Sequence, residues 1–188
     1  MEKCQIRAVY NEDTIRVYQA YSKKIGEEAI KLGTFGPNFK LTRMTWIKPS
    51  FLWMMYRCGW ATKDKNQECV LGIDIKRQAF DYLVKNSVPS SKSKNNDTTI
   101  TDEEWKEKIK NSDIRVQWDP ERDIYGNPLN YRSIQLGLRG KAVENYVNDW
   151  IVNIEDITAY VRDLNQKKQE GIDIIPLLPK EKIYNISQ

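Results

Sequence analysis

The sequence predicts a single α+β domain. Segments rich in β-branched and aromatic residues are mixed with capped helical segments, no strict strand–helix–strand alternation is present, and no internal repeat is visible. A chain of 188 residues is long enough to bury its own hydrophobic core without a disulfide or a structural metal. We therefore expect one domain over residues 1–188, with a mobile loop at about 87–100 and a C-terminal tail at about 170–188.

The elements of the N-terminal half are predicted from strand-forming composition and from helix caps. Ser22 and Gly33, for example, bracket a segment whose apolar residues have helical spacing. Residues 69–75 are largely apolar, which is typical of a strand buried on both faces. The expected elements are strands at residues 4–10, 14–21, 45–47 and 69–75, and helices at residues 23–32, 50–59 and 76–85.

The C-terminal half is again rich in strands. Thr101 and Glu104 have the spacing of a capping box and predict a charged helix. Residues 119–128 contain Asp-Pro and Gly-Asn-Pro, which predict a turn. The remaining expected elements are strands at residues 114–118, 131–136 and 150–154, and helices at residues 101–111, 141–148 and 158–169.

The absence of histidine excludes several classes of chemistry. Ser-His-Asp and Cys-His catalysis, histidine-paired ribonuclease chemistry and histidine-rich zinc sites all need a residue that the chain lacks. Cys4, Cys58 and Cys69 are odd in number and lack paired spacing, so we expect reduced thiols and no metal centre. Any acid or base in a site must be a carboxylate, Lys, Tyr or Cys.

Charge and hydropathy limit the partners. The net charge of +4 and the pI near 8.8 are compatible with a nucleotide, DNA or RNA. No apolar run approaches the roughly 18 residues of a membrane span, and the first residues lack the apolar stretch of a secretory signal. We expect a cytoplasmic protein without a membrane partner; the sequence does not indicate an oligomeric state.

The strongest candidate site is the block at residues 43–60, in which tryptophans and cations surround a Lys-Pro-Ser corner. Ser50 is predicted at a helix N-terminus, where free N–H groups and the helix dipole suit a phosphate. Arg43, Lys48 and Arg57 would add positive charge. The alternative is that the aromatic residues of this block belong to the core, with the cations extended over the surface.

Carboxylates supply two further candidates. Asp74-Ile-Lys76 follows the apolar strand and matches half of a metal-dependent nuclease site, in which carboxylates hold Mg²⁺ and the lysine orients water. Asp149 and Glu155 bracket the expected strand at residues 150–154. Both are also common kinds of surface residue.

Several segments together resemble one known family. They are residues 7–11, 14–21, 43–57, 116–122 and 131–138. On these segments the chain resembles the family called domain of unknown function 4291, over about residues 5–165. That family name implies no activity.

The order of elements is also similar to that of the ADP-ribosyltransferase fold, which implies a mixed, split β-sheet flanked by short helices. In that superfamily the first strand carries an aromatic residue and then Arg or His, and here Gln19 stands at that position. A strand ends in a Ser/Thr-rich tip, which corresponds to residues 48–50. A late strand carries a catalytic glutamate, for which Asp149 or Glu155 would substitute.

This resemblance implies an NAD-dependent ADP-ribosyltransferase. The basic pI and the lysine-rich loops at residues 63–65 and 92–94 favour a nucleic acid as its acceptor. Cleavage of the bond between nicotinamide and ribose passes through an oxocarbenium-like state, which one carboxylate, Asp149 or Glu155, would stabilise. The expected residues that bind NAD are Gln19, Tyr21, Arg43, Trp46, Lys48, Ser50, Trp53 and Arg132.

Two alternatives remain open. The first is a non-catalytic module that binds nucleic acid, in which arginines and lysines contact phosphates beside four tryptophans that stack on bases, Trp46, Trp53, Trp60 and Trp118. The second is a Mg²⁺-dependent nuclease built on Asp74 and Lys76.

Overall fold

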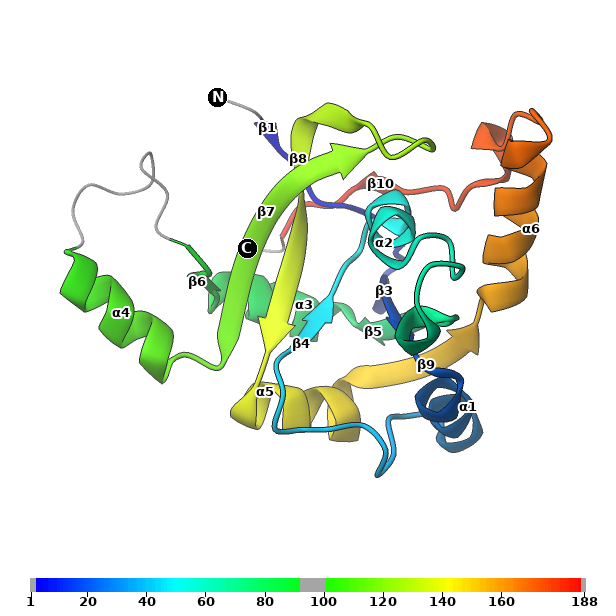
Figure 1. Ribbon diagram of the computed structural model, residues 1–188. Coiled ribbons are helices and arrows are strands. Elements are labelled where there is room, and N and C mark those ends of the chain that lie inside the picture. The colour runs from blue at the N-terminus through cyan, green and yellow to red at the C-terminus, as the bar shows by residue number, and fades with distance from the viewer. Residues whose placement is uncertain (1–2, 92–100, 187–188) are drawn as a thin grey trace.

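The computed structural model describes residues 3–91 and 101–186. It is a mixed α+β domain in which helices surround two larger β-sheets, with a separate two-stranded sheet beside them (Figure 1). Of the two larger sheets, one has three strands and the other has five. Within the described residues, no helix is long and apolar enough to cross a membrane.

The three-stranded sheet is antiparallel, with β5 (Cys69–Lys76) between β3 (Thr14–Tyr21) and β9 (Ile151–Asp156). Its two faces bury different clusters, because successive side chains of a strand point in opposite directions. Ile15 and Val17 belong to one cluster and Tyr18 to the other. The apolar composition of β5 is thus explained by burial on both faces, as the sequence predicts.

The five-stranded sheet is built around a long antiparallel hairpin of β7 (Ile114–Arg122) and β8 (Pro128–Leu138), which crosses the molecule in Figure 1. The other three strands are short. They are β1 (Lys3–Cys4) and β4 (Thr45–Ile47), which both pair with β8, and β6 (Val88–Pro89), which pairs with β7.

Helices cover the sheets and connect them. They are α1 (Lys23–Leu32), α2 (Phe51–Cys58), α3 (Arg77–Lys85), α4 (Asp102–Asn111), α5 (Gly140–Asn145) and α6 (Thr158–Gln169). Helix α4 begins with the predicted capping box of Thr101 and Glu104. Helix α5 continues into a π-helical turn, Tyr146–Trp150, which leads directly into β9.

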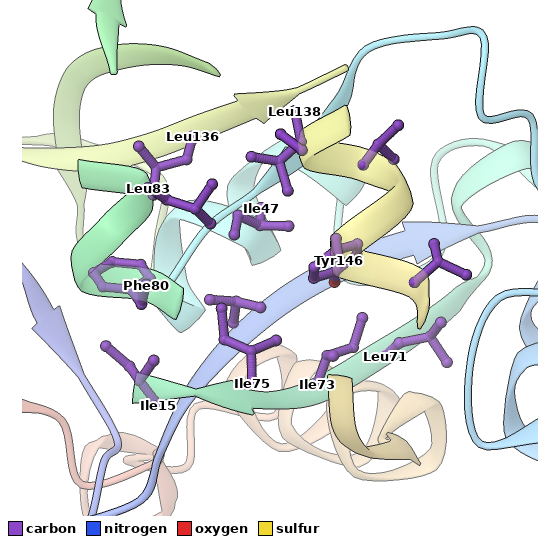
Figure 2. Close-up of a cluster of buried hydrophobic side chains, with 14 of the residues drawn as sticks. Ile15, Ile47, Leu71, Ile73, Ile75, Phe80, Leu83, Leu136, Leu138 and Tyr146 are labelled. Carbon is purple, nitrogen blue, oxygen red and sulfur yellow. The ribbon is translucent and has the colours of Figure 1, made fainter. Parts of the chain in front are cut away.

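The larger core lies between the sheets (Figure 2). Ile73 and Ile75 of β5 face Leu136 of β8, and Phe80 of α3 and Tyr146 close the sides. All five side chains are at most 2% exposed. The second cluster lies on the other face of the three-stranded sheet, where α2 and α6 cover β3 and β5.

Some sequence predictions were wrong in detail. The expected strand at residues 4–10 is interrupted, giving β1 and β2 (Arg7–Ala8), and β2 pairs with β10 (Lys182–Ile183) of the C-terminal tail. The turn expected at residues 119–128 is shorter, because β7 continues to Arg122. Part of the expected loop at residues 87–100 forms β6, and residues 92–100 lie outside the described residues.

Candidate functional site

The two sheets meet at one point beside the Lys-Pro-Ser corner. Tyr18 of β3 and Lys48, which follows β4, form an isolated antiparallel bridge in which the Tyr18 amide donates to the Lys48 carbonyl at 2.7 Å. Between Gln19 and Tyr21 on β3 and Trp46 on β4 there is a cavity of about 600 Å³. That volume is in the range of small-molecule sites in proteins.

The cavity is lined by residues from both sheets, from α2 and from the loops around them. They are Gln19, Ala20, Tyr21, Ser22, Ile25, Asn38, Phe39, Lys40, Arg43, Met44, Thr45, Trp46, Lys48, Trp53, Met54, Arg57, Asn66, Gln67, Gln117 and Gln135. Among these described residues there are four cations and no carboxylate. The cavity therefore has a positive electrostatic character.

Lys48 is the buried cation of this group. Its side chain is almost enclosed, at 6% exposure, and its Nζ lies 5.3 Å from the centre of the Trp53 ring. No described residue accepts a hydrogen bond from Nζ. Burial, together with the charge of Arg57, lowers the pKa of the Lys48 ammonium to about 8, although Asp119 and Cys58 act in the opposite direction.

The positions of the two tryptophans of the cavity depend on a glycine in β8 and on the N-cap of α2. Gly137 of β8 faces Trp46, and a Cβ at that position would lie 3.0 Å from the indole ring and 2.8 Å from Sδ of Met44. Glycine at this position therefore allows the indole to approach the strand closely. Trp53 lies in the first turn of α2, where its amide donates to Oγ of Ser50 at 3.1 Å.

A chain of side-chain hydrogen bonds fixes the wall of the cavity that β3 forms. Tyr146 donates to Oε1 of Gln19 at 2.7 Å, and Nε2 of Gln19 is 2.7 Å from the hydroxyl of Tyr21. Gln19 is only 2% exposed, so its polar atoms are satisfied within the protein. Gln19 and Tyr21 thus line the cavity mainly as a rigid support.

The opposite wall carries an amide pair that the sequence analysis missed. Nε2 of Gln117 donates to Oδ1 of Asp119 at 2.8 Å, and Nε2 of Gln135 donates to Oδ2 at 2.7 Å. One carboxylate therefore orients both amides on the β7–β8 hairpin. The only signal in the sequence is the presence of polar residues at alternate positions of these strands.

Six of the eight residues predicted to bind NAD line this cavity: Gln19, Tyr21, Arg43, Trp46, Lys48 and Trp53. Ser50 and Arg132 do not line it. At the α2 N-terminus, where a phosphate site was predicted, two of the first backbone amides already have partners within the protein. Ser50 caps Trp53, and the Phe51 amide donates to Oε1 of Glu181 at 2.7 Å. Arg132 instead donates to the Trp118 carbonyl.

The structure does not bring Asp149 or Glu155 to the cavity. Asp149, in the turn before β9, forms an exposed ion pair with Lys76 at 2.6 Å. Glu155 of β9 pairs with Arg16 at 2.8 Å. Arg16 and Gln19 are three residues apart on β3, so their side chains point to opposite faces of the sheet. Glu155 lies on the Arg16 face and does not line the cavity.

The carboxylate of Asp74 is also occupied. Nε and Nη2 of Arg16 donate to its two oxygens at 2.8 and 2.7 Å. Gly72 makes room for this guanidinium, since a Cβ there would lie 2.9 Å from Nη1 of Arg16. Burial alone would raise the pKa of Asp74, but the hydrogen bonds and charge of Arg16 outweigh it and lower that pKa. A guanidinium thus holds the position that a nuclease would need for Mg²⁺.

The four tryptophans expected to stack on bases are not on one surface. Trp46 and Trp53 line the cavity, whereas Trp60 is 8% exposed and belongs to the second core cluster, beneath Nζ of Lys168. Trp118 packs against the larger core. Of the two lysine-rich loops, residues 92–94 lie outside the described residues.

Comparison with known families identifies the chain. Residues 5–184 match the family described as domain of unknown function (DUF4291), so the chain belongs to that family. The match covers the three-stranded sheet, all of the five-stranded sheet except β1, and the whole cavity lining. No curated protein matches the chain.

Proposed function

We propose that this protein binds a phosphate-bearing aromatic ligand of the nucleotide class in the cavity between β3 and β4. The proposal rests on the surroundings of the Lys48 ammonium. The side chain of Lys48 is only 6% exposed and its ammonium has no hydrogen-bond acceptor among the described residues, in a cavity whose described lining has no carboxylate. A buried cation without a partner is costly, and an anionic ligand would supply the missing one.

The rest of the cavity suits the two halves of such a ligand. Arg43 and Arg57 are exposed at its rim and can donate bidentate hydrogen bonds to phosphate. Trp46 and Trp53 offer aromatic surface against which a base or a pyridine ring can stack. The amides of Gln117 and Gln135 are fixed in orientation by Asp119 and can pair with polar ring atoms.

NAD is one ligand with this chemistry, and ADP-ribosyl transfer remains a prediction of the element order. The reaction needs a carboxylate beside the ribose. Asp149 and Glu155 are engaged in ion pairs outside the cavity, so the support from the structure is for ligand binding and not for the transfer step.

Calorimetric titration with ATP, NAD and a short single-stranded oligonucleotide tests the proposal. Arg57→Ala should weaken binding at least tenfold, since a charge-assisted hydrogen bond contributes about 2 kcal/mol. Trp53→Leu should also weaken it. Lys85→Ala, on the exposed face of α3, is the matched control and should bind as the native protein does.

The proposal fails if none of the three ligands binds, or if Arg57→Ala and Trp53→Leu bind as tightly as Lys85→Ala. Nicotinamide release is measured in parallel with NAD. Release that disappears in Glu155→Gln or Asp149→Asn would support the transferase, whereas binding of NAD without release would limit the protein to ligand binding.

A further inference from the structure

We propose that Lys48 forms an imine with the aldehyde or ketone group of an anionic ligand in this cavity. The inference uses the same anion-binding cavity as the proposed function. It adds a covalent activity that does not require the ligand to be a nucleotide.

The position of the amine supports this role. The Lys48 backbone is fixed by the bridge to Tyr18 and by Pro49, and its side chain ends in the cavity, where Nζ has no acceptor among the described residues. Nucleophilic lysines are typically desolvated or lie beside another cation. Lys48 has both features, because its side chain is buried and the charge of Arg57 acts on it.

Other lysines of the chain are in different surroundings. Among the residues that the structure describes, the lysines that form ion pairs with carboxylates are all more exposed than Lys48: Lys23, Lys76, Lys141 and Lys167. An amine paired with a carboxylate is stabilised as ammonium and is a poor nucleophile. Lys40 lines the same cavity but is exposed to solvent, which makes it the natural internal comparison.

The charged groups around Nζ set its protonation. From α2, Arg57 disfavours the ammonium and the Cys58 thiol favours it; from β7, Asp119 favours it; burial opposes it most strongly. The balance leaves a pKa of about 8. Close to that pH about half of the Lys48 side chains carry the free electron pair that attack on a carbonyl requires.

The reaction balances without an oxidant or reductant. The neutral amine attacks the carbonyl carbon, so a C–N bond forms while the C=O π bond breaks; the nitrogen gives up its first proton and the oxygen takes one up, which gives a neutral carbinolamine. The carbinolamine loses a proton from nitrogen and a hydroxyl group, and the C=N bond forms. One water molecule is released, and both proton transfers can use solvent in the open cavity. Arg43 and Arg57 would hold the ligand's phosphate or carboxylate meanwhile.

Pyridoxal 5′-phosphate is a suitable probe because it joins an aromatic ring, an aldehyde and a phosphate. The protein is incubated with it near pH 8, reduced with borohydride and mapped by peptide mass spectrometry. We expect at least tenfold more label on Lys48 than on Lys40. Pyridoxal, which lacks the phosphate, should lose this preference, and 4-deoxypyridoxine 5′-phosphate, which lacks the aldehyde, should compete without being attached.

Two variants complete the test. Lys48→Arg should abolish the selective label, and Lys40→Arg should retain it. Label spread evenly over exposed lysines, or no enrichment at Lys48 in the native protein, would overturn the inference, and this readout needs no variant to fold. Because no nucleotide is present, a negative result here is distinct from failure of ATP or NAD to bind. Selective label without nucleotide binding would refute only the proposed function.

Discussion

Replacing Lys48 by methionine should make the free protein more stable. Methionine keeps a long, flexible side chain but removes the buried charge. The fall in the Lys48 pKa from 10.5 to about 8 corresponds to about 3 kcal/mol of destabilisation of the ammonium in the folded state. Loss of the contact with the Trp53 ring offsets about 1 kcal/mol. The expected net gain at pH 6.5 is therefore about 2 kcal/mol.

The sign of the pH dependence follows from the same shift. The unfolded chain holds the Lys48 proton up to pH 10.5, whereas the folded protein releases it near pH 8. Between these values the unfolded state binds more protons, so the native protein gains stability as pH rises. The advantage of Lys48→Met should accordingly shrink to about 1 kcal/mol or less at pH 9.5.

Urea denaturation of the native protein and Lys48→Met at pH 6.5 and 9.5 measures this difference. Lys40→Met is the control, because Lys40 lines the same cavity but is exposed, and its replacement should leave the urea midpoint unchanged at both pH values. The reasoning is refuted if Lys48→Met is less stable than the native protein at pH 6.5, or if the difference between them does not change with pH.

Three further changes test other parts of the fold by urea denaturation. Gly26→Ala places a Cβ 2.2 Å from Sγ of Cys69, so it should cost about 2 kcal/mol, and adding Cys69→Ala should recover part of that loss. Arg16→Gln removes the guanidinium hydrogen bonds to Asp74, which keeps the one from Asn153, and should cost about 2 kcal/mol at pH 7; since the pKa of Asp74 is lowered in the folded protein, the deficit should begin to shrink below about pH 4 and be lost as pH falls through that lowered pKa. Burial raises the pKa of Glu181 to about 8, so the native protein should lose stability relative to Glu181→Gln as pH rises from 5 to 8; a constant gap would contradict this.

Most of the long elements could be predicted because local signals define them. Ser50 and Gly59 do cap α2, and Gly59 adopts the left-handed conformation that ends a helix. Strands of two residues, such as β2, β6 and β10, have no such pattern, since their pairing is decided by distant parts of the chain.

The strand through Pro120 was missed for a physical reason. Proline is usually excluded from a central strand because it cannot donate to the ladder. However, β6 pairs with β7 only at Arg115 and Val116, so β7 is an edge strand where it reaches Pro120. The register also shifts between Pro120 and Arg122, as a bulge would produce.

The cavity residues that lie close together in the sequence were found, and those that depend on strand register were not. Residues 43–57 bring cations and tryptophans together locally, and the structure places them around one cavity. Whether Glu155 shares a face with Gln19 depends on the pairing across β5, where a shift of one residue reverses the face. Composition and spacing do not determine that register.

The hydrogen bonds of Asp119 explain why this carboxylate does not neutralise the positive charge of Lys48. This carboxylate is near enough to raise the pKa of Lys48, yet both of its oxygens accept hydrogen bonds from Gln117 and Gln135. A direct ion pair would have stabilised the ammonium and filled the space beside it. Instead, Asp119 is engaged by the two amides, and Lys48 lines the cavity without an ion pair to any described residue. An apolar residue at position 48 would make the free protein more stable, and the proposed function accounts for the charge of Lys48 by giving it an anionic ligand as its partner.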